Sequence, residues 1–252
     1  MVSFDLNGRI ALVTGASRGI GRAIAETLAS HGAEVVVVSR KQAGVDAVAE
    51  GIRANGGKAV GFACHMASLA DMDSLYRWLG DSAGRLDILV NNAATNPFFG
   101  EMGAIDEGAF DKTLDVNLKG PFFMIQKAIP LMQAAGKGAV LNVASVNGIR
   151  PAPLQGVYSI TKGALITMTQ AFAKELAPHG IRVNALLPGF TDTQFSATLM
   201  QNEAIYKMVV AQIPLKRHAQ PDEMAGAALY LVSDASSYTT GACMVCDGGL
   251  LA

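Results

Sequence analysis

The chain has 252 residues, of which 50% are hydrophobic and only 16% charged. This composition excludes intrinsic disorder, which requires low hydrophobicity and high net charge. Because 20 Lys and Arg stand against 21 Asp and Glu, there is no basic excess, and we expect no nucleic acid partner. The longest apolar run, 227–232, is far shorter than the roughly 18 residues of a membrane span, so we expect no membrane partner.

Short apolar runs alternate with longer segments of helical spacing along the chain. The expected strands are 10–13, 34–38, 59–63, 86–90, 139–143, 182–187 and 242–246, and the expected helices are 20–31, 43–54, 69–81, 110–135, 158–177 and 222–233. Continuously apolar strands are typical of parallel sheets that are buried on both faces. The alternation predicts an α/β fold, a single doubly wound domain over 1–252 with a seven-stranded parallel sheet and helices on both faces. Segment 191–214 has helical spacing without a following strand, and we expect it to be a substrate lid.

The chain ends and the cysteines indicate a cytoplasmic protein. The first residues, 1–5, lack the pattern of a signal peptide, and residues 250–252 are no peroxisomal tripeptide. Cys243 and Cys246 form a C-x-x-C, but residues three apart on a strand point to opposite faces. We therefore expect buried core thiols here and no metal site.

A glycine-rich turn follows the first expected strand. Residues 14–21 read T-G-A-S-R-G-I-G and lead into a helical segment. Glycines at these places permit a tight turn, a close approach of the backbone to a pyrophosphate and close helix–strand packing. The helix start offers free N–H groups to the anion. The strand before and the strand after make this a dinucleotide site, and the expected cofactor ligands in it are Gly15, Ser17, Arg18, Gly19, Ile20 and Gly21.

Two arginines favour NADP(H) over NAD(H). Enzymes that use NAD place a carboxylate after the second strand, where it meets the ribose diol. This chain instead has Arg40 there, and Arg18 lies in the glycine turn. Two guanidinium groups fit a 2′-phosphate. The alternative is that both arginines are solvated at loop tips.

Four polar residues form a candidate catalytic set. Tyr158 and Lys162 are four positions apart on an expected helix and therefore share a face. A nearby ammonium lowers the pKa of a phenol, which suits acid–base chemistry. Ser145 follows an apolar strand, at the carboxyl edge where such sheets bind ligands. Asn117 lies inside a helical pattern despite its poor helix propensity, which indicates a further role.

Taken in order, these motifs resemble those of the classical short-chain dehydrogenase/reductase family over nearly the whole chain. The resemblance rests on the glycine turn, Asn91-Asn92-Ala93-Ala94, the four polar residues, and Pro188-Gly189 with Thr193. It implies that Tyr158 is the general acid or base, that Lys162 lowers its pKa and holds the nicotinamide ribose, and that Ser145 binds the substrate oxygen. Asn117 would position a water molecule for proton return.

The resemblance also implies contacts to cofactor and substrate. The further cofactor residues are His65, Met66, Asn92, Pro188, Gly189, Thr191 and Thr193, with Tyr158 and Lys162 shared with catalysis; the substrate residues are Ser145, Asn147, Tyr158, Phe98 and Phe195. Asn92 is expected on the adenosine ribose and the segment from Phe190 to Thr193 on the carboxamide. The chain departs from the family pattern at Ala94, at Thr191 and at Cys64-His65, so a contact of His65 with adenine and a structural role are both open.

The carbonyl/retinol reductase branch is the most similar part of the family, although its frequent peroxisomal tail is missing. An apolar pocket wall is expected from Phe98, Phe99, Phe195, Leu199, Met200 and Met208. The leading hypothesis is an NADP(H)-dependent oxidoreductase that interconverts a small apolar ketone or aldehyde and its alcohol. Alternatives are a 3-oxoacyl-carrier-protein reductase, a sugar dehydrogenase, and a non-enzymatic NADP-sensing module. In the family, helices equivalent to 110–135 and 158–177 pair across subunits, which implies a homotetramer.

Overall fold

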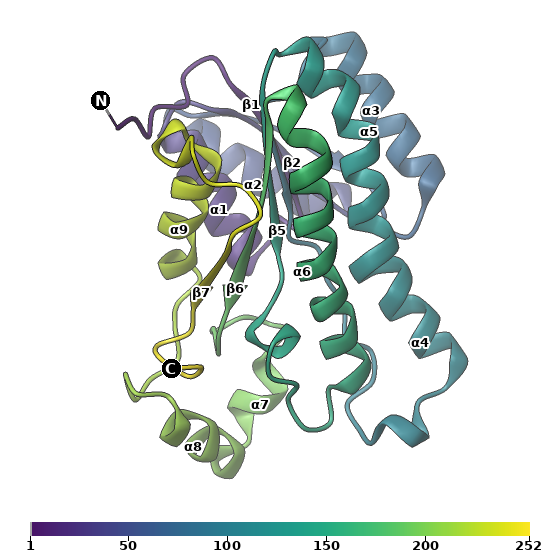
Figure 1. Cartoon of the computed structure of the whole chain (residues 1–252), viewed down its shortest axis with the longest axis vertical. Coiled ribbons are helices and arrows are strands. Elements are labelled where there is room, and N and C mark those ends of the chain that lie inside the picture. Colours follow the sequence, from purple (N-terminus) through teal and green to yellow (C-terminus); the bar gives the residue numbers. More distant parts are fainter. Residues whose placement is uncertain (1) are drawn as a thin grey trace.

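A computed structural model describes residues 2–252, with all their side chains apart from those of residues 198 and 199. Seven parallel strands form one sheet in the order β3-β2-β1-β4-β5-β6-β7, which confirms the predicted doubly wound architecture (Figure 1). The strands are β1 Ile10–Thr14, β2 Glu34–Ser39, β3 Lys58–Ala63, β4 Ile88–Asn91, β5 Gly138–Val143, β6 Ile181–Pro188 and β7 Cys243–Cys246.

Helices cover both faces of the sheet because successive strand residues point to opposite sides. On β1, Val13 packs with α1, α2 and α9, whereas Leu12 packs with α3, α5 and α6. Residues 2–252 contain no helix with the length and hydropathy that a bilayer crossing requires. The helices are α1 Gly19–Ser30, α2 Gln42–Ala54, α3 Leu69–Ala83, α4 Glu107–Leu114, α5 Gly120–Ala134, α6 Gly156–Leu176, α7 Ala197–Gln201, α8 Glu203–Gln212 and α9 Asp222–Val232.

The helix expected over 110–135 is interrupted, so that prediction was wrong. A π-helical turn, Asp115–Lys119, separates α4 from α5. Asn117 lies in this turn with none of its surface exposed. Its Oδ1 accepts from Thr95 N (2.8 Å), and its Nδ2 donates to Thr95 O (2.9 Å) and to Thr161 Oγ1 (3.2 Å). These contacts explain the irregular turn, because they hold the Asn117 amide in place while the helix passes around it.

Cys243 and Cys246 are free thiols on opposite faces of β7. Cys243 packs beside Leu165 and Leu187, whereas Cys246 packs on the face covered by α1 and α9. Both are half-buried, so the expected full burial was wrong. Partial burial still raises the pKa of both thiols.

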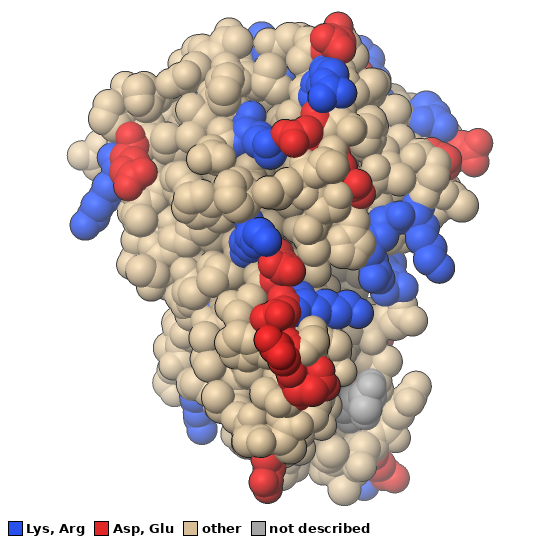
Figure 2. Space-filling view, turned by 90° about the vertical axis from the view of Figure 1, so that its right-hand side faces the viewer, with Lys and Arg blue, Asp and Glu red and all other residues tan. Residues whose placement is uncertain are grey.

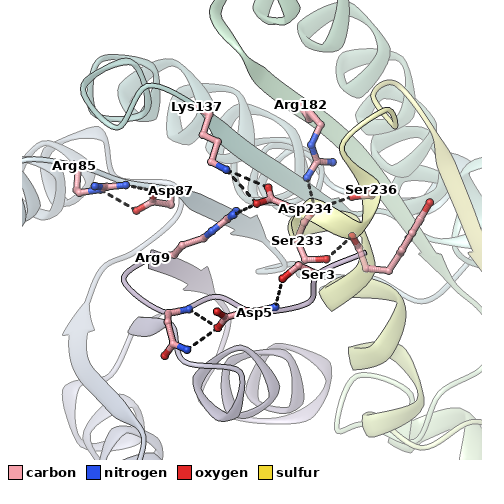
Figure 3. A network of polar contacts seen from close by, with 12 residues as sticks. Ser3, Asp5, Arg9, Arg85, Asp87, Lys137, Arg182, Ser233, Asp234 and Ser236 are labelled. Atoms are coloured by element: carbon pink, nitrogen blue, oxygen red, sulfur yellow. Dashed lines mark hydrogen bonds and ion pairs between the residues drawn. The ribbon is translucent and has the colours of Figure 1, made fainter. Parts of the chain in front are cut away.

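Charged residues connect the amino ends of the strands, at the edge opposite to the one described next (Figure 3). Asp87, nearly fully buried, accepts from Ile10 N (3.0 Å) and pairs with Arg85. Asp234 accepts from Arg9 and from Lys137 (3.2 Å). Because Ile10, Asp87 and Lys137 precede or begin three neighbouring strands, this network fixes where those strands start.

Candidate active site

The glycine turn connects β1 to α1 at the carboxyl edge of the sheet. Gly15 and Gly19 have positive φ angles of 64° and 57°, which side chains rarely tolerate. A Cβ atom on Gly21 would lie 2.3 Å from Asn92 Nδ2 and 2.6 Å from Gly15 O. Position 21 therefore requires glycine for two reasons. Asn92, which follows β4, approaches it closely, and α1 also packs tightly on the sheet.

Asn92 supports this turn directly. Its Nδ2 donates to Thr14 O (2.9 Å) and to Gly15 O (3.2 Å), whereas the sequence led us to expect it on a ribose. Thr14 completes the connection, because its Oγ1 accepts from the backbone N–H groups of Asn92 (2.9 Å) and Ala93 (3.1 Å). The amide nitrogen of Asn92 thus positions the turn.

The start of α1 is open to an anion. Arg18 is the N-cap residue with an extended backbone, and no side chain caps the first turn. The first N–H groups therefore remain available to a ligand. Ser17 is half-buried beside Gly44 of α2, and Ile20 packs against the core. These contacts hold the turn rigidly against α1 and α2.

Arg18 and Arg40 lie at the ends of neighbouring strands. Arg18 follows β1, Arg40 follows β2, and Ala16 N donates to Val38 O (3.1 Å) between them. Both arginines are exposed. Neither guanidinium forms a hydrogen bond or ion pair with residues 2–252. Two exposed cations without partners among residues 2–252 therefore follow neighbouring strands at the same edge of the sheet.

His65 and Met66 follow β3, the strand beside β2. His65 N donates to Asp71 Oδ2 (2.9 Å), and His65 Nδ1 accepts from Ala67 N (3.1 Å). With Nδ1 used as an acceptor, a neutral His65 carries its proton on Nε2 and offers a donor. Met66 is buried, and its carbonyl oxygen lies close to Gly120 at the start of α5.

The segment after β6 lies over the glycine turn. A Cβ atom on Gly19 would be 3.3 Å from Thr193 Cγ2, which places Thr193 directly above α1. Thr191 is buried and forms an isolated bridge to Ala219. The Ser196 hydroxyl contacts Thr191 O (2.6 Å) and Thr193 O (3.0 Å) and thereby holds this segment in shape. Pro188 ends β6, and Gly189 passes so close to Asp247 that a Cβ atom would clash at 2.6 Å.

Ser145, Tyr158 and Lys162 come together at the ends of β5 and α6. The Ser145 hydroxyl lies near enough to the phenol of Tyr158 to lower its pKa. Lys162 Nζ donates to Val143 O (2.7 Å) and lies 5.5 Å from the centre of the Tyr158 ring. Asn117 reaches the same region through Thr161, which lies on α6 beside Lys162. All four expected catalytic residues therefore surround one location.

The pKa of Tyr158 differs from the sequence expectation. Burial raises it to about 12, although the neighbouring Ser145 hydroxyl acts in the opposite direction. Burial also lowers the pKa of Lys162 to about 7. The expected lowering of the phenol pKa by Lys162 is thus absent here, because burial dominates both groups and the Lys162 amine donates to the Val143 carbonyl. At neutral pH the phenol holds its proton.

The lowered Lys162 pKa predicts a pH-dependent stability. Between pH 7 and the ordinary lysine value of 10.5, the unfolded chain binds more protons at this group, so the free energy of unfolding rises with pH. We expect the rise from pH 7 to pH 9 to be smaller in Lys162→Met than in the natural protein, by at most about 1.4 kcal/mol per pH unit. Urea unfolding at both pH values measures this difference, and parallel changes would contradict it. The raised pKa of Tyr158 makes the free energy of unfolding fall as pH rises. This opposite effect begins only above pH 10, the ordinary pKa of a tyrosine.

The structure places only some of the expected substrate residues beside the candidate catalytic residues. The ring of Phe195 packs on that of Tyr158, with centroids 5.1 Å apart. Phe98 lies in the loop after β4, where its ring covers Gly100. Asn147 follows Ser145 and donates its backbone N–H to Ser145 Oγ (3.1 Å). Phe195 and Asn147 thus lie at the catalytic set, whereas Phe98 packs within its own loop.

The expected apolar wall is only partly formed. Phe99, Phe195 and Met208 are all exposed, so none of them forms a buried lining, although Phe195 still contacts the Tyr158 ring. Met200 is half-buried beside Ser196, and the side chain of Leu199 lies outside the described residues. Segment 191–214 contains α7 and α8, and Tyr206 of α8 hydrogen-bonds His218 Nδ1 (3.0 Å). A cavity of about 170 Å³ beside His218 is lined by none of the expected catalytic residues.

Sequence reasoning missed three polar residues of the site. Gln155 is buried at the start of α6 and contacts Asn147, Thr161 holds Asn117, and Thr14 holds Asn92. Thr14 had a detectable signal, since it is the polar residue that ends an apolar strand. Thr161 had none, because its partner Asn117 is 44 residues away, and Gln155 lies in no motif although Asn147 is only 8 residues away.

Comparisons with known proteins agree with this geometry. The family model described as "Enoyl-(Acyl carrier protein) reductase" matches residues 15–251. Dehydrogenase/reductase SDR family member 4 of Oryctolagus cuniculus is 39% identical over 244 residues, which cover 97% of this chain and 94% of the relative.

Solved structures show the same fold over the full chain. A putative gluconate dehydrogenase from Agrobacterium tumefaciens has a TM-score of 0.97 at 33% identity and covers 100% of this chain and 99% of its own. A gluconate 5-dehydrogenase from Burkholderia cenocepacia, in complex with NADP and tartrate, has a TM-score of 0.95 at 32% identity and covers 99% and 98%. The chain therefore belongs to the short-chain dehydrogenase/reductase family.

Proposed function

We propose that this protein is an NADP(H)-dependent oxidoreductase that reduces a small, largely apolar ketone or aldehyde to its alcohol. One observation carries the proposal: Ser145, Tyr158, Lys162 and Asn117 converge beside a segment that covers the glycine turn. NADPH supplies the hydride when bound. The chain supplies the site for the substrate oxygen and the proton.

The protonation of Tyr158 supports the reductive direction. With a pKa near 12, the phenol is protonated at neutral pH and acts as the general acid. The Ser145 hydroxyl donates to the substrate oxygen as negative charge develops on it. Lys162, within reach of the phenol ring, holds the nicotinamide ribose. Asn117 and Thr161 fix the wall behind Lys162 and position the water molecule through which Tyr158 is reprotonated.

NADP(H) is the proposed cofactor because the residues present fit its phosphates. The open start of α1 accepts the pyrophosphate at Gly19, with Thr193 above it. Arg18 and Arg40 bind the 2′-phosphate as charge-assisted, bidentate donors. The Burkholderia neighbour was solved with NADP, which supports this choice. His65 offers an N–H donor to the adenine.

The substrate class follows from the packing of Phe195 on Tyr158, with segment 191–214 acting as the lid. An NADP-sensing module is the weaker hypothesis, because it does not require the catalytic set. A sugar acid dehydrogenase is a second candidate, favoured by the solved neighbours described as gluconate dehydrogenases. The family model's description favours an acyl chain on a carrier protein as a further alternative.

A panel of substrates tests the proposal. Oxidation of NADPH is followed with simple ketones, 5-ketogluconate and a 3-oxoacyl thioester. We expect the highest kcat/KM with the ketones. A preference for the sugar acid or the thioester would replace the proposed substrate class, and failure with all three would overturn the function.

Several exposed apolar side chains support assembly into a homotetramer. Phe110, Phe122 and Ile160 lie exposed on α4, α5 and α6. Figure 2 shows that charged groups of both signs are separated by large uncharged areas on the face it presents. The exposed apolar side chains of α4, α5 and α6 favour contact between copies of the chain. The cytoplasmic location expected from the sequence stays a prediction.

A further inference from the structure

Two amide side chains lie beside the catalytic hydroxyls, and only one of them, Asn147, was expected there. Gln155 has 8% of its surface exposed and is the N-cap residue of α6, three positions before Tyr158. Asn147 Nδ2 donates to Gln155 Oε1 (3.3 Å), and Asn147 N donates to Ser145 Oγ (3.1 Å). The amide pair is thus connected to Ser145 through the backbone of Asn147.

The amide pair leaves one amide nitrogen and one amide oxygen without a partner in the described part of the chain. The contact uses one amide nitrogen and one amide oxygen, so that Gln155 Nε2 and Asn147 Oδ1 remain. Turning both amides over would exchange the roles but leave the same two functions. Among residues 2–252, the enclosed side-chain atoms without a partner are Asn91 Oδ1 and Asn96 Nδ2. The two remaining atoms of the amide pair therefore face accessible space.

A hydroxyl group is the complement of this arrangement, because it both donates and accepts a hydrogen bond. A ketone or ether oxygen only accepts, and an alkyl group does neither. The amide pair is joined to Ser145, whereas the aromatic ring of Phe195 covers Tyr158. A carbonyl held by Ser145 and Tyr158 thus has a polar environment on the Ser145 side and an apolar one at the phenol ring.

We propose that Asn147 and Gln155 determine specificity by selecting an α-hydroxy ketone, with the hydroxyl on the carbon next to the reacting carbonyl and an apolar group on the other side. The inference rests on the proposed function and names its substrate class. Gln155 Nε2 donates to the substrate hydroxyl, and Asn147 Oδ1 accepts from it. The product is a vicinal diol, whose second hydroxyl keeps both contacts.

Three matched ketones test the proposal with the full-length protein and NADPH. 2-Hydroxyacetophenone is compared with propiophenone, in which a methyl group replaces the hydroxyl, and with 2-methoxyacetophenone, which keeps the oxygen but has no O–H donor. We expect kcat/KM for the hydroxy ketone to exceed both others by at least about tenfold, the effect of one net hydrogen bond. Gln155→Met removes the amide at similar length and is expected to lower this preference about tenfold.

Asn147→Ala is a second, independent test of the ketone preference. It removes the side-chain amide but keeps the backbone N–H that contacts Ser145. Gln133→Met, at an exposed glutamine of α5, is the matched control and should retain the preference. NADPH binding and thermal unfolding verify that each variant is folded. If Gln155→Met does not fold, the ketone preference of Asn147→Ala tests the proposal instead. A preference unchanged in the folded variants, or absent from the natural protein, overturns the inference while ketone reduction stands. Failure to oxidise NADPH with any ketone overturns the proposed function itself.

Discussion

Tyr158→Phe is expected to lower kcat/KM for carbonyl reduction by about 10²–10⁴-fold, the usual contribution of a general acid. The substitution removes one oxygen and keeps the ring that packs on Phe195, so the local fold should persist. NADPH affinity should change little, because the glycine turn and both arginines are untouched. Steady-state kinetics and fluorescence titration with NADPH measure the two quantities separately.

Tyr238→Phe is the control for this prediction. Tyr238 is fully exposed, so removing its hydroxyl should leave turnover unchanged. Turnover that survives in Tyr158→Phe would contradict the assignment of the acid. Loss of NADPH binding in the same variant would instead indicate that the phenol contributes mainly to the cofactor site.

Arg40→Asp is expected to reverse much of the cofactor preference. The natural protein should favour NADPH over NADH, and the variant should lower the ratio of the two kcat/KM values by about 10²-fold or more. A lost charge-assisted contact accounts for roughly 1.5–3 kcal/mol, and the new carboxylate also repels the 2′-phosphate. The carboxylate can instead accept from the ribose hydroxyls of NADH. Initial rates with both cofactors give the ratio.

The matched control for the charge change is Arg77→Asp. Arg77 is exposed on α3, a helix on the other face of the sheet from α1 and α2. The same change of two charge units at Arg77 should leave the ratio of kcat/KM with NADPH to kcat/KM with NADH unaltered. An unaltered ratio in Arg40→Asp would mean that Arg40 is merely solvated, which was the alternative interpretation of the sequence.

The sheet, the glycine turn and the meeting of the four candidate catalytic residues at one edge of the sheet could be predicted because local patterns encode them. The run from Glu34 to Val38 is continuously apolar after its first residue, and in the structure it is buried between two strands. Tyr158 and Lys162 follow helical spacing. The start of β4 was misplaced by two residues, since the expected strand began at Leu86 and β4 begins at Ile88. The side chain of Asp87, which binds Ile10 N, precedes the strand there.

Contacts between distant segments determined the features that could not be predicted. The partners of Asn117 lie 22 and 44 residues away, so no local pattern could indicate the π-helical turn. The amide nitrogen of Asn92 is directed to the glycine turn by the same kind of long-range contact. Burial, which sequence spacing does not report, determined the direction of the pKa shift at Tyr158.

The ion pairs that connect the strand starts have a consequence for how this protein can change. Asp87 and Asp234 connect the strand starts at one edge of the sheet (Figure 3), whereas the candidate cofactor and catalytic residues lie at the other. The contacts that connect the strand starts therefore do not involve those residues. We expect an exchange of the proposed lid, segment 191–214, for that of a relative to change substrate choice, whereas a substitution of Asp87 should endanger folding. The sheet of this protein can therefore stay unchanged while the loops at its other edge change.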